Sequence, residues 1–556
     1  MLLTAVFALT AAANVDVDVS ADRHPISEYV YGVNFGPEAQ VRRMGVTLRR
    51  FGGNGYSRYN PQNHTTNEGG DGRWFRNVVL DGGVDAFLAT SNAAGAASLV
   101  ELPLLGWVAK GGSAVAPPWT CGSSVAKYGA QLTVAPDDSD CGDGLLPDAG
   151  RLYGHDPLDT SEPIDAGFLR GYVEQLLDGG VRLFELGNQP ALWSSTHQDV
   201  HPQPASYAEI RARLAESAAV VKAADPQART LGPSEWGWLA YFDSAAGDRA
   251  SSGIDFVPYY LREARLLELA SGTRQLDYLD LHVYPMAQSP DVGVITRGDV
   301  TPAVAALRLR STRILWDTSY AVESWESCCF DTVLKIIPRM RGWVDAGYPG
   351  TGLAISAYNW GALDHISGAL ALADVLGIFG REGVDLAMLD GMPPDGAVGE
   401  DAFKLYRDYD GLGARFGSTS VRATSDDVSV SAYASTQGDR LMVVVINKDA
   451  ALSQAVDVAL TGVPGSGTYR AFAVTPSQRL GASGTGTFTA GHLVRVMPPW
   501  TAELLELMPA GWDGGFPPFD AGVPDAGADA GEPDAGTDGG TPDAGAPDGG
   551  GPDAGV

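Results

Sequence analysis

The sequence predicts an α/β protein: a (β/α)8 TIM barrel with an attached antiparallel β-sandwich domain and a disordered C-terminal tail. Three features of the 556 residues support this fold class. Short apolar segments alternate with helical segments through the middle of the chain, as in a barrel of parallel strands. A later region alternates apolar and polar residues in short runs, which is typical of antiparallel strands. The end of the chain repeats Pro-Asp-Ala-Gly and has almost no side chains to bury.

The barrel is predicted at residues 21–415, where short apolar segments have the length and composition of strands. Between two of them, Ser206 and Glu209 form a capping box that begins a helix, and Ile210 and Leu214 follow at helical spacing. The active sites of such barrels lie at the C-terminal ends of the strands. The predicted strands are residues 31–35, 46–51, 98–105, 182–187, 229–234, 278–284, 353–360 and 384–389.

The β-domain and the two chain ends are predicted from their patterning. Residues 416–508 form the β-domain, and the alternating segment 14–20 adds a strand to it. Residues 509–556 carry ten acidic residues and no Lys or Arg, and we expect them to be disordered. Residues 1–14 are an apolar run ending in small residues, which resembles the end of a secretory signal and predicts a secreted, cell-surface or periplasmic protein.

Charge and apolar run lengths restrict the partners. The net charge is −30, so nucleic acids and anionic membranes would be repelled and neither is expected as a partner. Beyond residues 1–14, no segment has about 18 uninterrupted apolar residues, so we expect no membrane span. A neutral polysaccharide suits such a chain, and we expect a monomer. Four Cys fit an oxidising compartment: Cys121 and Cys141 could close a loop, whereas Cys328 and Cys329 are adjacent.

Four of the predicted strands end in polar and aromatic residues. Arg, Asn, His, Tyr and Trp are placed at the mouth of the barrel by RRFGGN (49–54), GNQPALW (187–193), LHVYP (281–285) and SAYNWG (356–361). Planar donors and acceptors bind sugar hydroxyls, and aromatic rings cover the apolar faces of pyranose rings. The strand ends therefore indicate a carbohydrate site.

These motifs resemble those of glycoside hydrolase family 44, and the resemblance covers roughly residues 20–508. It is carried, in order, by ISEYVYGVNF, RRFGGNGYSRYN, WFRN, DCGDG with GHDPLDTS, GNQPALWSSTHQDVHP, GPSEWGWLAYF, LDYLDLHVYP, YPGTGLAISAYNWG, ISGALALADVLGIFGREGV and YRDYDGLGARFG. The resemblance implies a retaining endo-β-1,4-glucanase or xyloglucanase scaffold, with a barrel and an attached β-sandwich.

Both catalytic carboxylates of that family are substituted in this chain. The family's acid/base is the Glu of Asn-Glu-Pro, which falls on Gln189, and its nucleophile is the Glu of Thr-Glu-Tyr-Asn-Trp, which falls on Ala357. A retaining glycosidase needs two carboxyl groups about 5–5.5 Å apart. An amide has no proton to give near neutral pH, and a methyl group cannot attack the anomeric carbon. The sequence therefore predicts a catalytically impaired protein that still binds β-1,4-linked polysaccharide.

The expected substrate-binding residues lie around these two positions. Arg50, Asn54 and Asn188 would hold hydroxyl groups, and His282 and Tyr284 share one face of the sixth strand by the two-residue period. The aromatic residues expected at the cleft are Trp74, Trp193, Trp316, Tyr358 and Trp360, from a larger group of tryptophans in loops and strand ends that includes Trp236, Trp238 and Trp325.

Other acids of the sequence are candidate replacements for the missing carboxylates. Glu185 lies about 13 Å below Gln189 along the same strand and is expected to be a buried acid paired with an Arg. The loop before the seventh strand carries Asp317, Glu323 and Glu326, and Asp364 follows that strand; any of these could reach the cleft.

The Asp- and Gly-rich segment 140–161 is the candidate metal site. The resemblance implies a metal-stabilised loop there, in which Asp156 and Asp159 would be ligands of a structural Ca²⁺. The alternative is that these Asp side chains cap turns. No organic cofactor is expected.

Three functions follow from the sequence. The first is a secreted, catalytically impaired family-44-like protein that binds cellulose-type or xyloglucan chains. The second is an active endo-β-1,4-glucanase or xyloglucanase that uses other carboxylates. The third is a non-catalytic surface interaction protein whose cleft no longer binds sugar.

Overall fold

The computed structural model describes residues 13–69, 74–112, 120–148, 150–288 and 295–514. All of them belong to one compact unit, Met1–Pro517. Residues 1–12 of the predicted secretory signal and most of the predicted tail lie outside the described residues. No helix in the described part of the chain has the length and apolar character needed to cross a membrane.

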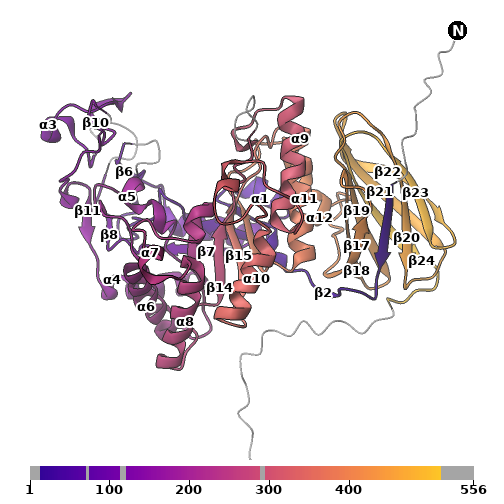
Figure 1. The fold of residues 1–556 in the computed structure, drawn as a ribbon, viewed down its shortest axis with the longest axis horizontal. Coiled ribbons are helices and arrows are strands. Elements are labelled where there is room, and N and C mark those ends of the chain that lie inside the picture. The colour runs from indigo at the N-terminus through magenta and orange to yellow at the C-terminus, as the bar shows by residue number, and fades with distance from the viewer. Residues whose placement is uncertain (1–12, 70–73, 113–119, 149, 289–294, 515–556) are drawn as a thin grey trace, which may run out of the picture. The chain divides into compact units, whose positions relative to one another are not determined.

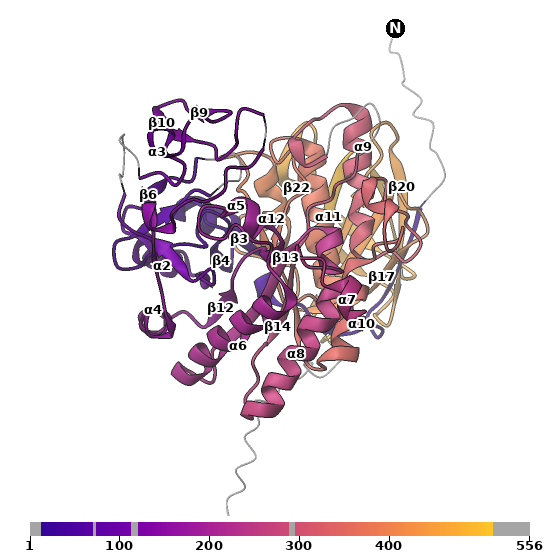
Figure 2. The same ribbon diagram turned by 60° about the vertical axis from the view of Figure 1, so that its left-hand side comes forward.

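Eight parallel strands close into a barrel, which confirms the predicted fold class (Figures 1 and 2). Each predicted strand segment overlaps one of them. Around the barrel the strands are β3 (Gly32–Asn34), β4 (Leu48–Phe51), β7 (Ala97–Leu102), β12 (Leu183–Leu186), β13 (Arg229–Trp236), β14 (Tyr278–His282), β15 (Gly352–Tyr358) and β16 (Leu386–Leu389), and β16 pairs with β3 to close the ring. A layer of buried apolar side chains, including Leu48, Leu99, Leu183 and Leu231, forms a separate small core of strand residues.

Helices surround this ring of strands (Figure 2). The predicted capping box begins the longest of them, because the Ser206 hydroxyl accepts a hydrogen bond from the Glu209 N–H at 3.3 Å. The longer helices are α1 (Glu38–Met44), α2 (Gly83–Ala94), α4 (Ala166–Asp178), α6 (Tyr207–Ala224), α8 (Phe256–Ser271), α9 (Pro302–Ser311), α10 (Ile336–Gly347), α11 (Ile366–Glu382) and α12 (Gly399–Arg407).

Long excursions leave the barrel after β4 and β7 and build a lobe beside its mouth. They contain β5 (Thr65–Asn67), β6 (Asn77–Val79), β8 (Trp107–Ala109), α3 (Val125–Tyr128), β9 (Val134–Ala135), β10 (Asp138–Gly142), η2 (Pro157–Asp159) and β11 (Ser161–Pro163). Shorter pieces follow later strands: η3 (Pro190–Leu192), α5 (Trp193–Thr196), η4 (Trp238–Tyr241), α7 (Arg249–Ser252), η5 (Ile295–Arg297), η6 (Thr312–Leu315) and η7 (Trp325–Cys328).

The β-domain is a ten-stranded sheet with its own apolar core. Its strands are β1 (Ala13–Asp18), β2 (His24–Pro25), β17 (Thr419–Ser425), β18 (Val430–Gln437), β19 (Arg440–Asn447), β20 (Gln454–Thr461), β21 (Gly467–Thr475), β22 (Gln478–Phe488), β23 (His492–Met497) and β24 (Thr501–Pro509). The predicted N-terminal strand inserts between β17 and β20. It is antiparallel to β17 but parallel to β20, so the sheet is mixed rather than wholly antiparallel.

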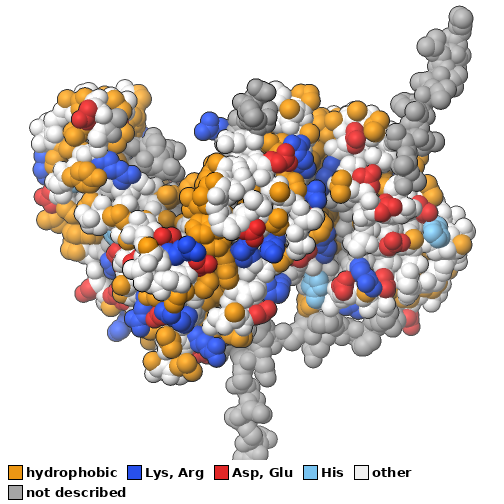
Figure 3. Space-filling view, in the orientation of Figure 1, with side chains coloured by type: hydrophobic (Ala, Val, Ile, Leu, Met, Phe, Trp, Pro, Cys, Tyr) orange, Lys and Arg blue, Asp and Glu red, His pale blue; other side chains and the backbone are white. Residues whose placement is uncertain are grey.

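The net charge of −30 is not spread evenly over the chain. Acidic and basic side chains are interspersed over the face of the barrel shown in Figure 3. Ten of the acidic residues lie after residue 508, where no Lys or Arg balances them.

The barrel and the β-domain are joined by a buried ion pair. Asp374 of α11 accepts hydrogen bonds from Lys448 Nζ at 2.6 Å, Tyr433 OH at 2.8 Å and Thr312 Oγ1 at 2.6 Å. Gly377, one turn further along α11, leaves room for the Tyr433 ring, since a Cβ there would lie 2.3 Å from it. Burial raises the pKa of Asp374, but Lys448 and these hydrogen bonds lower it more, so the net shift is downward.

We predict that Asp374→Asn destabilises the protein by about 3 kcal/mol, because the buried Lys448 ammonium would lose its counter-charge. The measurement is the midpoint of guanidinium-induced unfolding at neutral pH. The same stabilisation should fade in the native protein as the pH falls below the usual pKa of Asp, because the unfolded chain then binds a proton that the folded Asp374 does not bind until a lower pH. The control is Glu38→Gln, which removes the exposed Glu38–Arg42 pair and should cost less than about 1 kcal/mol. Equal effects of the two substitutions would contradict this role of Asp374.

Candidate active site

A cleft of about 710 Å³ opens at the C-terminal ends of the barrel strands. This volume lies within the range of about 300–1,000 Å³ that is usual for ligand sites. Its walls combine amide, aromatic and charged side chains, among them Arg50, Asn54, Tyr56, Glu68, Asn188, Gln189, Trp236, His282, Tyr284, Ala357 and Asp390.

Gln189 and Ala357 line this same cleft. Gln189 follows β12 in a left-handed conformation (φ 46°), and its N–H donates to the carbonyl of Ser234 at 3.0 Å. Ala357 lies near the end of β15 and is buried, with its methyl group against the cleft. The structure therefore brings together the two positions at which the resemblance implies catalytic carboxylates, and neither side chain can ionise.

The Gln189 amide begins a buried chain of hydrogen bonds that crosses three strands. Gln189 Nε2 lies 2.9 Å from His282 Nδ1, and His282 Nε2 lies 2.8 Å from Ser356 Oγ. Asp280 Oδ2 accepts at 2.6 Å from Ser356 and at 2.6 Å from Ser234. An amide nitrogen only donates, so His282 accepts at Nδ1 and carries its proton on Nε2. Each donor in the chain meets an acceptor, which suits an amide at position 189.

Arg50 and Glu185 form a fully buried pair below the cleft. Arg50 Nε and Nη2 each donate to the Glu185 carboxylate at 2.6 Å, and Nη2 also donates to Asn188 Oδ1 at 2.7 Å. Asn188 Nδ2 in turn donates to Asn54 Oδ1 at 2.7 Å. Burial alone would raise the pKa of Glu185, but the charge of Arg50 lowers it more. The expectation of a buried acid paired with an Arg is confirmed, and the pair fixes the orientation of Asn188.

Two further buried carboxyls were missed by the sequence analysis. Glu101 of β7 accepts from the Gly53 N–H at 2.7 Å, and burial together with the charge of Glu185 raises its pKa. Glu235 of β13 accepts from the N–H groups of Trp236 at 2.9 Å and Ala191 at 3.0 Å. Burial raises the pKa of Glu235 to about 8, although both N–H bonds oppose the shift. Glu235 holds the turn that carries Gln189, a role that only the tertiary contact with Ala191 reveals.

Some predicted aromatic residues do not face the cleft. Trp193 is buried and donates from Nε1 to the Asn188 carbonyl at 2.8 Å, while Trp360 donates from Nε1 to Ser311 at 3.2 Å. Tyr358 packs edge-on against Phe379 of α11, since its side chain alternates to the face opposite that of Ala357. None of these three residues lines the cleft, so the structure does not place them where the sequence predicts substrate contacts. The large rings of these three residues fill the space between the strands and the helices.

The aromatic rings that do line the cleft are those of Trp236, Tyr284 and Tyr56. Trp236 and Tyr284 meet edge to face with ring centroids 6.4 Å apart, which holds the half-buried Trp236 ring in place. Trp74 is half-buried and is not among the lining residues, and Trp316 lies in a different cavity. Both differ from the prediction. Arg50, Asn54, Asn188, His282 and Tyr284 do line the cleft as expected.

The four loop acids that are candidate replacements for the catalytic carboxylates lie outside the cleft. Asp317 and Glu323 pair with arginines, Glu326 is buried against Ser324, and Asp364 is exposed; none of the four lines the cleft. Among the described residues, the cleft-lining acids are Glu68 and Asp390. The Asp390 carboxylate accepts from Tyr284 OH at 2.7 Å and from Asn34 Nδ2 at 3.1 Å.

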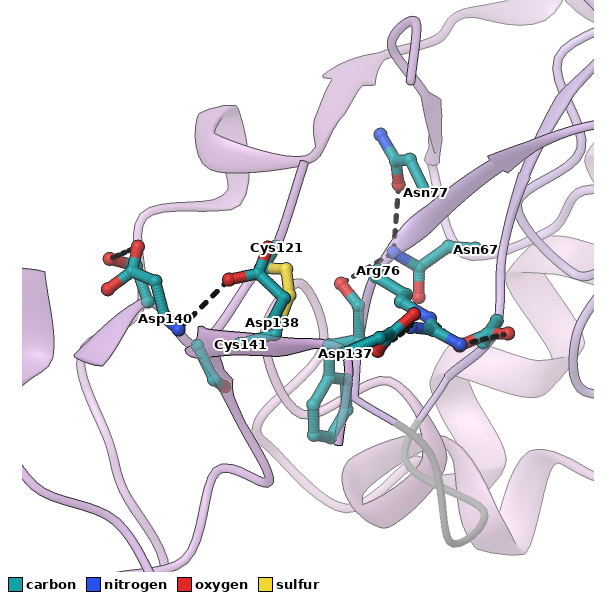
Figure 4. Close-up of a disulfide and its surroundings, with 12 residues drawn as sticks. Asn67, Arg76, Asn77, Cys121, Asp137, Asp138, Asp140 and Cys141 are labelled. Atoms are coloured by element: carbon teal, nitrogen blue, oxygen red, sulfur yellow. Dashed lines mark hydrogen bonds and ion pairs between the residues drawn. A yellow bond between two sulfur atoms is a disulfide. The ribbon is translucent and has the colours of Figure 1, made fainter. Parts of the chain in front are cut away.

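The lobe beside the cleft is closed by a disulfide between Cys121 and Cys141, and the adjacent Cys328 and Cys329 are also joined. Figure 4 shows Arg76 near the disulfide, beside Asp137. Arg76 Nε donates to Glu68 at 2.6 Å, and its Nη1 donates to Asp137 at 2.9 Å. Arg76 therefore links the disulfide-bonded segment to an acid that lines the cleft.

The two predicted calcium ligands already accept hydrogen bonds from groups of the protein. Asp156 caps the short helix η2 by accepting from the Leu158 N–H at 3.0 Å. The two oxygens of Asp159 accept from Lys127 Nζ and Tyr128 OH, each at 2.6 Å. An ammonium group thus already supplies the positive charge that a cation would bring. The arrangement fits the turn-capping alternative, and calcium binding stays a prediction from the sequence.

The fold and the cleft define a barrel protein of the glycoside hydrolase class. The family model of glycoside hydrolase family 44 matches residues 65–287. A solved xyloglucanase of that family from Paenibacillus polymyxa is 30% identical, with a TM-score of 0.76, and the match covers 90% of this chain and 100% of that one. CelM2, a bifunctional glucanase-xylanase from a metagenome library, is 33% identical, with a TM-score of 0.84 and coverage of 90% and 99%. The chain belongs to glycoside hydrolase family 44.

Curated relatives extend beyond the matched region. Endoglucanase A of Paenibacillus lautus is 31% identical over 463 residues, which are 78% of this chain and 63% of the relative. The beta-mannanase/endoglucanase A of Caldicellulosiruptor saccharolyticus is 30% identical over 496 residues, or 82% of this chain and 36% of the relative. The match therefore spans less than two thirds of the length of either relative.

We predict that Glu235 makes the native protein less stable as the pH rises. Its folded pKa of about 8 lies above the usual 4.5, so between these values the unfolded chain loses a proton that the folded chain keeps. Glu235→Gln should remove this slope, and the difference in unfolding free energy between variant and native protein should move in favour of the variant by roughly 5 kcal/mol between pH 4.5 and pH 8.

The slope is the readout of this experiment, because a Gln cannot accept both backbone N–H groups and its absolute stability will differ as well. Unfolding by guanidinium at several pH values measures it. Parallel pH dependences of the two proteins would show that Glu235 is ionised in the folded state.

Proposed function

We propose that this chain is an exported family-44 protein that binds β-1,4-linked glucans, xyloglucan among them, and has lost ordinary retaining hydrolysis. One observation carries the proposal: at the two catalytic positions implied by the resemblance, the cleft presents the amide of Gln189 and the methyl group of Ala357. The apolar run at residues 1–14 supports export, and polymeric glucans lie outside cells.

The loss of hydrolysis follows from the chemistry of the two side chains. Retaining hydrolysis requires an acid that protonates the leaving oxygen and a carboxylate that attacks the anomeric carbon. The Gln189 amide cannot donate a proton as a carboxylic acid does, and it cannot activate water in a second step. Ala357 cannot form a glycosyl intermediate. With both groups changed, neither step of the double displacement has the carboxyl groups that it requires.

Binding requires less of the cleft, and the groups for it are present. Asn54 and Asn188 offer amide groups, while Trp236 and Tyr284 offer aromatic surface for pyranose rings. The Arg50 and Glu185 charges cancel beneath them, so a neutral glycan meets no unbalanced charge there. A family-44 xyloglucanase of Paenibacillus polymyxa has been solved with xyloglucan, which supports this substrate class.

A second candidate function is slow hydrolysis through Asp390. This acid lines the cleft at the end of β16, and its N–H donates to the carbonyl of Tyr358, the residue after Ala357. One carboxylate beside bound substrate could activate a water molecule, as the base of an inverting glycosidase does. Any turnover of this kind would depend on Asp390 alone.

We predict that the double substitution Gln189→Glu with Ala357→Glu raises kcat/KM on xyloglucan by about 10⁴-fold or more, since general acid–base catalysis alone is worth about 10²–10⁴. Release of reducing sugar measures it. Each single substitution should restore much less, because both carboxyls act in every turnover.

Native chain and Asp390→Asn serve as controls for the restored protein. A native chain as active as the double variant would disprove the proposed impairment. Weak native activity that disappears in Asp390→Asn would instead establish the second candidate. A double variant that binds xyloglucan without cleaving it would show that the cleft does not present these positions to the anomeric carbon.

We predict that Trp236→Ala weakens binding of xyloglucan oligosaccharides by about tenfold, the loss of roughly 1–1.5 kcal/mol expected for one aromatic contact. Isothermal titration measures the Kd. The matched control is Trp343→Ala, a half-buried Trp of α10 that packs against Phe242 outside the cleft. Native protein that binds no glucan would favour the third function, a surface interaction protein.

A further inference from the structure

A second cavity, of about 460 Å³, lies where the barrel meets the β-domain. The barrel contributes Trp316 and Arg313 from η6 and its end, and Arg381 from the last turn of α11. The β-domain contributes residues of β17 and β18 and the turn between them. This cavity, which we call the junction cavity, shares no lining residue with the cleft at the barrel mouth.

The basic side chains of the junction cavity are paired within the protein. Arg313 Nε donates to Asp317 at 2.8 Å, and Arg381 Nε donates to Glu382 at 2.8 Å. Lys448 and Arg422 are likewise paired, with Asp374 and Asp18 respectively. Because each of these cations already has a carboxylate, and Asp22 and Asp427 also line the cavity, it offers no free positive charge to an anionic ligand. Such paired groups retain lone pairs and N–H bonds that can bind neutral hydroxyl groups.

The aromatic surface of the cavity is held in a fixed orientation. The Arg381 guanidinium lies 4.2 Å from the centroid of the Trp316 ring and 5.5 Å from that of Tyr433. This stacking covers one face of the half-buried Trp316 ring and fixes its plane. An indole among paired polar groups is the combination that binds the apolar face and the hydroxyls of a pyranose. Trp316 was expected to bind sugar at the mouth of the barrel; the same chemistry is present at this other place.

We propose that the junction cavity is a second saccharide site, which binds a short stretch of neutral β-glucan beside Trp316. Its volume is within the range of about 300–1,000 Å³ of ligand sites. The exposed Val428, in the turn between β17 and β18, stands among the lining residues with three quarters of its surface open to solvent. This inference rests on the proposed glucan specificity but assigns a different site.

Two sites on one chain would change how the protein holds a polymer. A second contact with the same polysaccharide becomes intramolecular once the first has formed, and such avidity can exceed either single affinity by about 10²–10⁴-fold. A chain that retains glucan rather than cleaving it gains most from this arrangement. The junction site would therefore act in retention on polysaccharide and have no part in catalysis.

The test is isothermal titration of the full chain with cellotetraose, together with retention on xyloglucan in affinity gels. The native protein should bind two equivalents. Trp316→Ala should bind one equivalent at the cleft with unchanged Kd, and its retention on xyloglucan should fall by about 10²-fold. Trp236→Ala should weaken the cleft site about tenfold and leave the junction site unchanged, and the two substitutions together should leave only the weakened cleft site.

Val428→Arg provides a second variant that leaves the core intact, since the side chain is exposed and an Arg there would obstruct the cavity. It should reproduce the effect of Trp316→Ala. One equivalent in the native protein, weakened in Trp236→Ala and unchanged in Trp316→Ala and Val428→Arg, would overturn the junction site and leave the proposed function standing. Binding lost only in the two junction variants would establish this site and overturn glucan binding in the cleft. Absence of any binding would overturn both.

Discussion

The bidentate pair between Arg50 and Glu185 is the interaction on which the cleft depends. Two charges are removed from water there, a loss that is offset only because the guanidinium also binds Asn188 and so leaves few of its N–H groups unpaired. Through Asn188 the pair orients Asn54 and the turn that carries Gln189. The floor of the cleft is thus organised by a structural ion pair and needs no catalytic carboxylate to keep its shape.

The environment of position 189 explains how an amide fits in this floor. A carboxylate at 189 would accept from His282 and would require the ring proton on Nδ1, whereas the present amide donates to Nδ1 and leaves the proton on Nε2 for Ser356. Ser356 can then donate to Asp280, so the chain ends on a charged acceptor. One substitution at the surface of the cleft is therefore matched by hydrogen bonds that reach into the core of the barrel.

The sequence was sufficient for the fold but only for part of the site. Strand periodicity and the capping box at Ser206 are local signals, and each predicted barrel strand has its counterpart in the structure. Arg50, Asn54 and Asn188 were found because they lie at or just after the C-terminal ends of strands. The predicted residues that do not line the cleft, such as Trp193 and Trp360, are large side chains whose direction is decided by helix packing rather than by position in the sequence. Glu235 was missed because its partner, the Ala191 N–H, belongs to another strand's loop.

The buried acids give a physical reason for neutral side chains at positions 189 and 357. Glu101 and Glu185 already lie close enough for the charge of Glu185 to raise the pKa of Glu101. Burial raises the pKa of Glu235 to about 8. Two more carboxylates at 189 and 357 would add like charges to the same desolvated region, at a cost that an active enzyme recovers as catalysis. A chain that only retains glucan recovers nothing from them. Neutral side chains then lower the electrostatic strain of the barrel while the amide and aromatic surface of the cleft is kept.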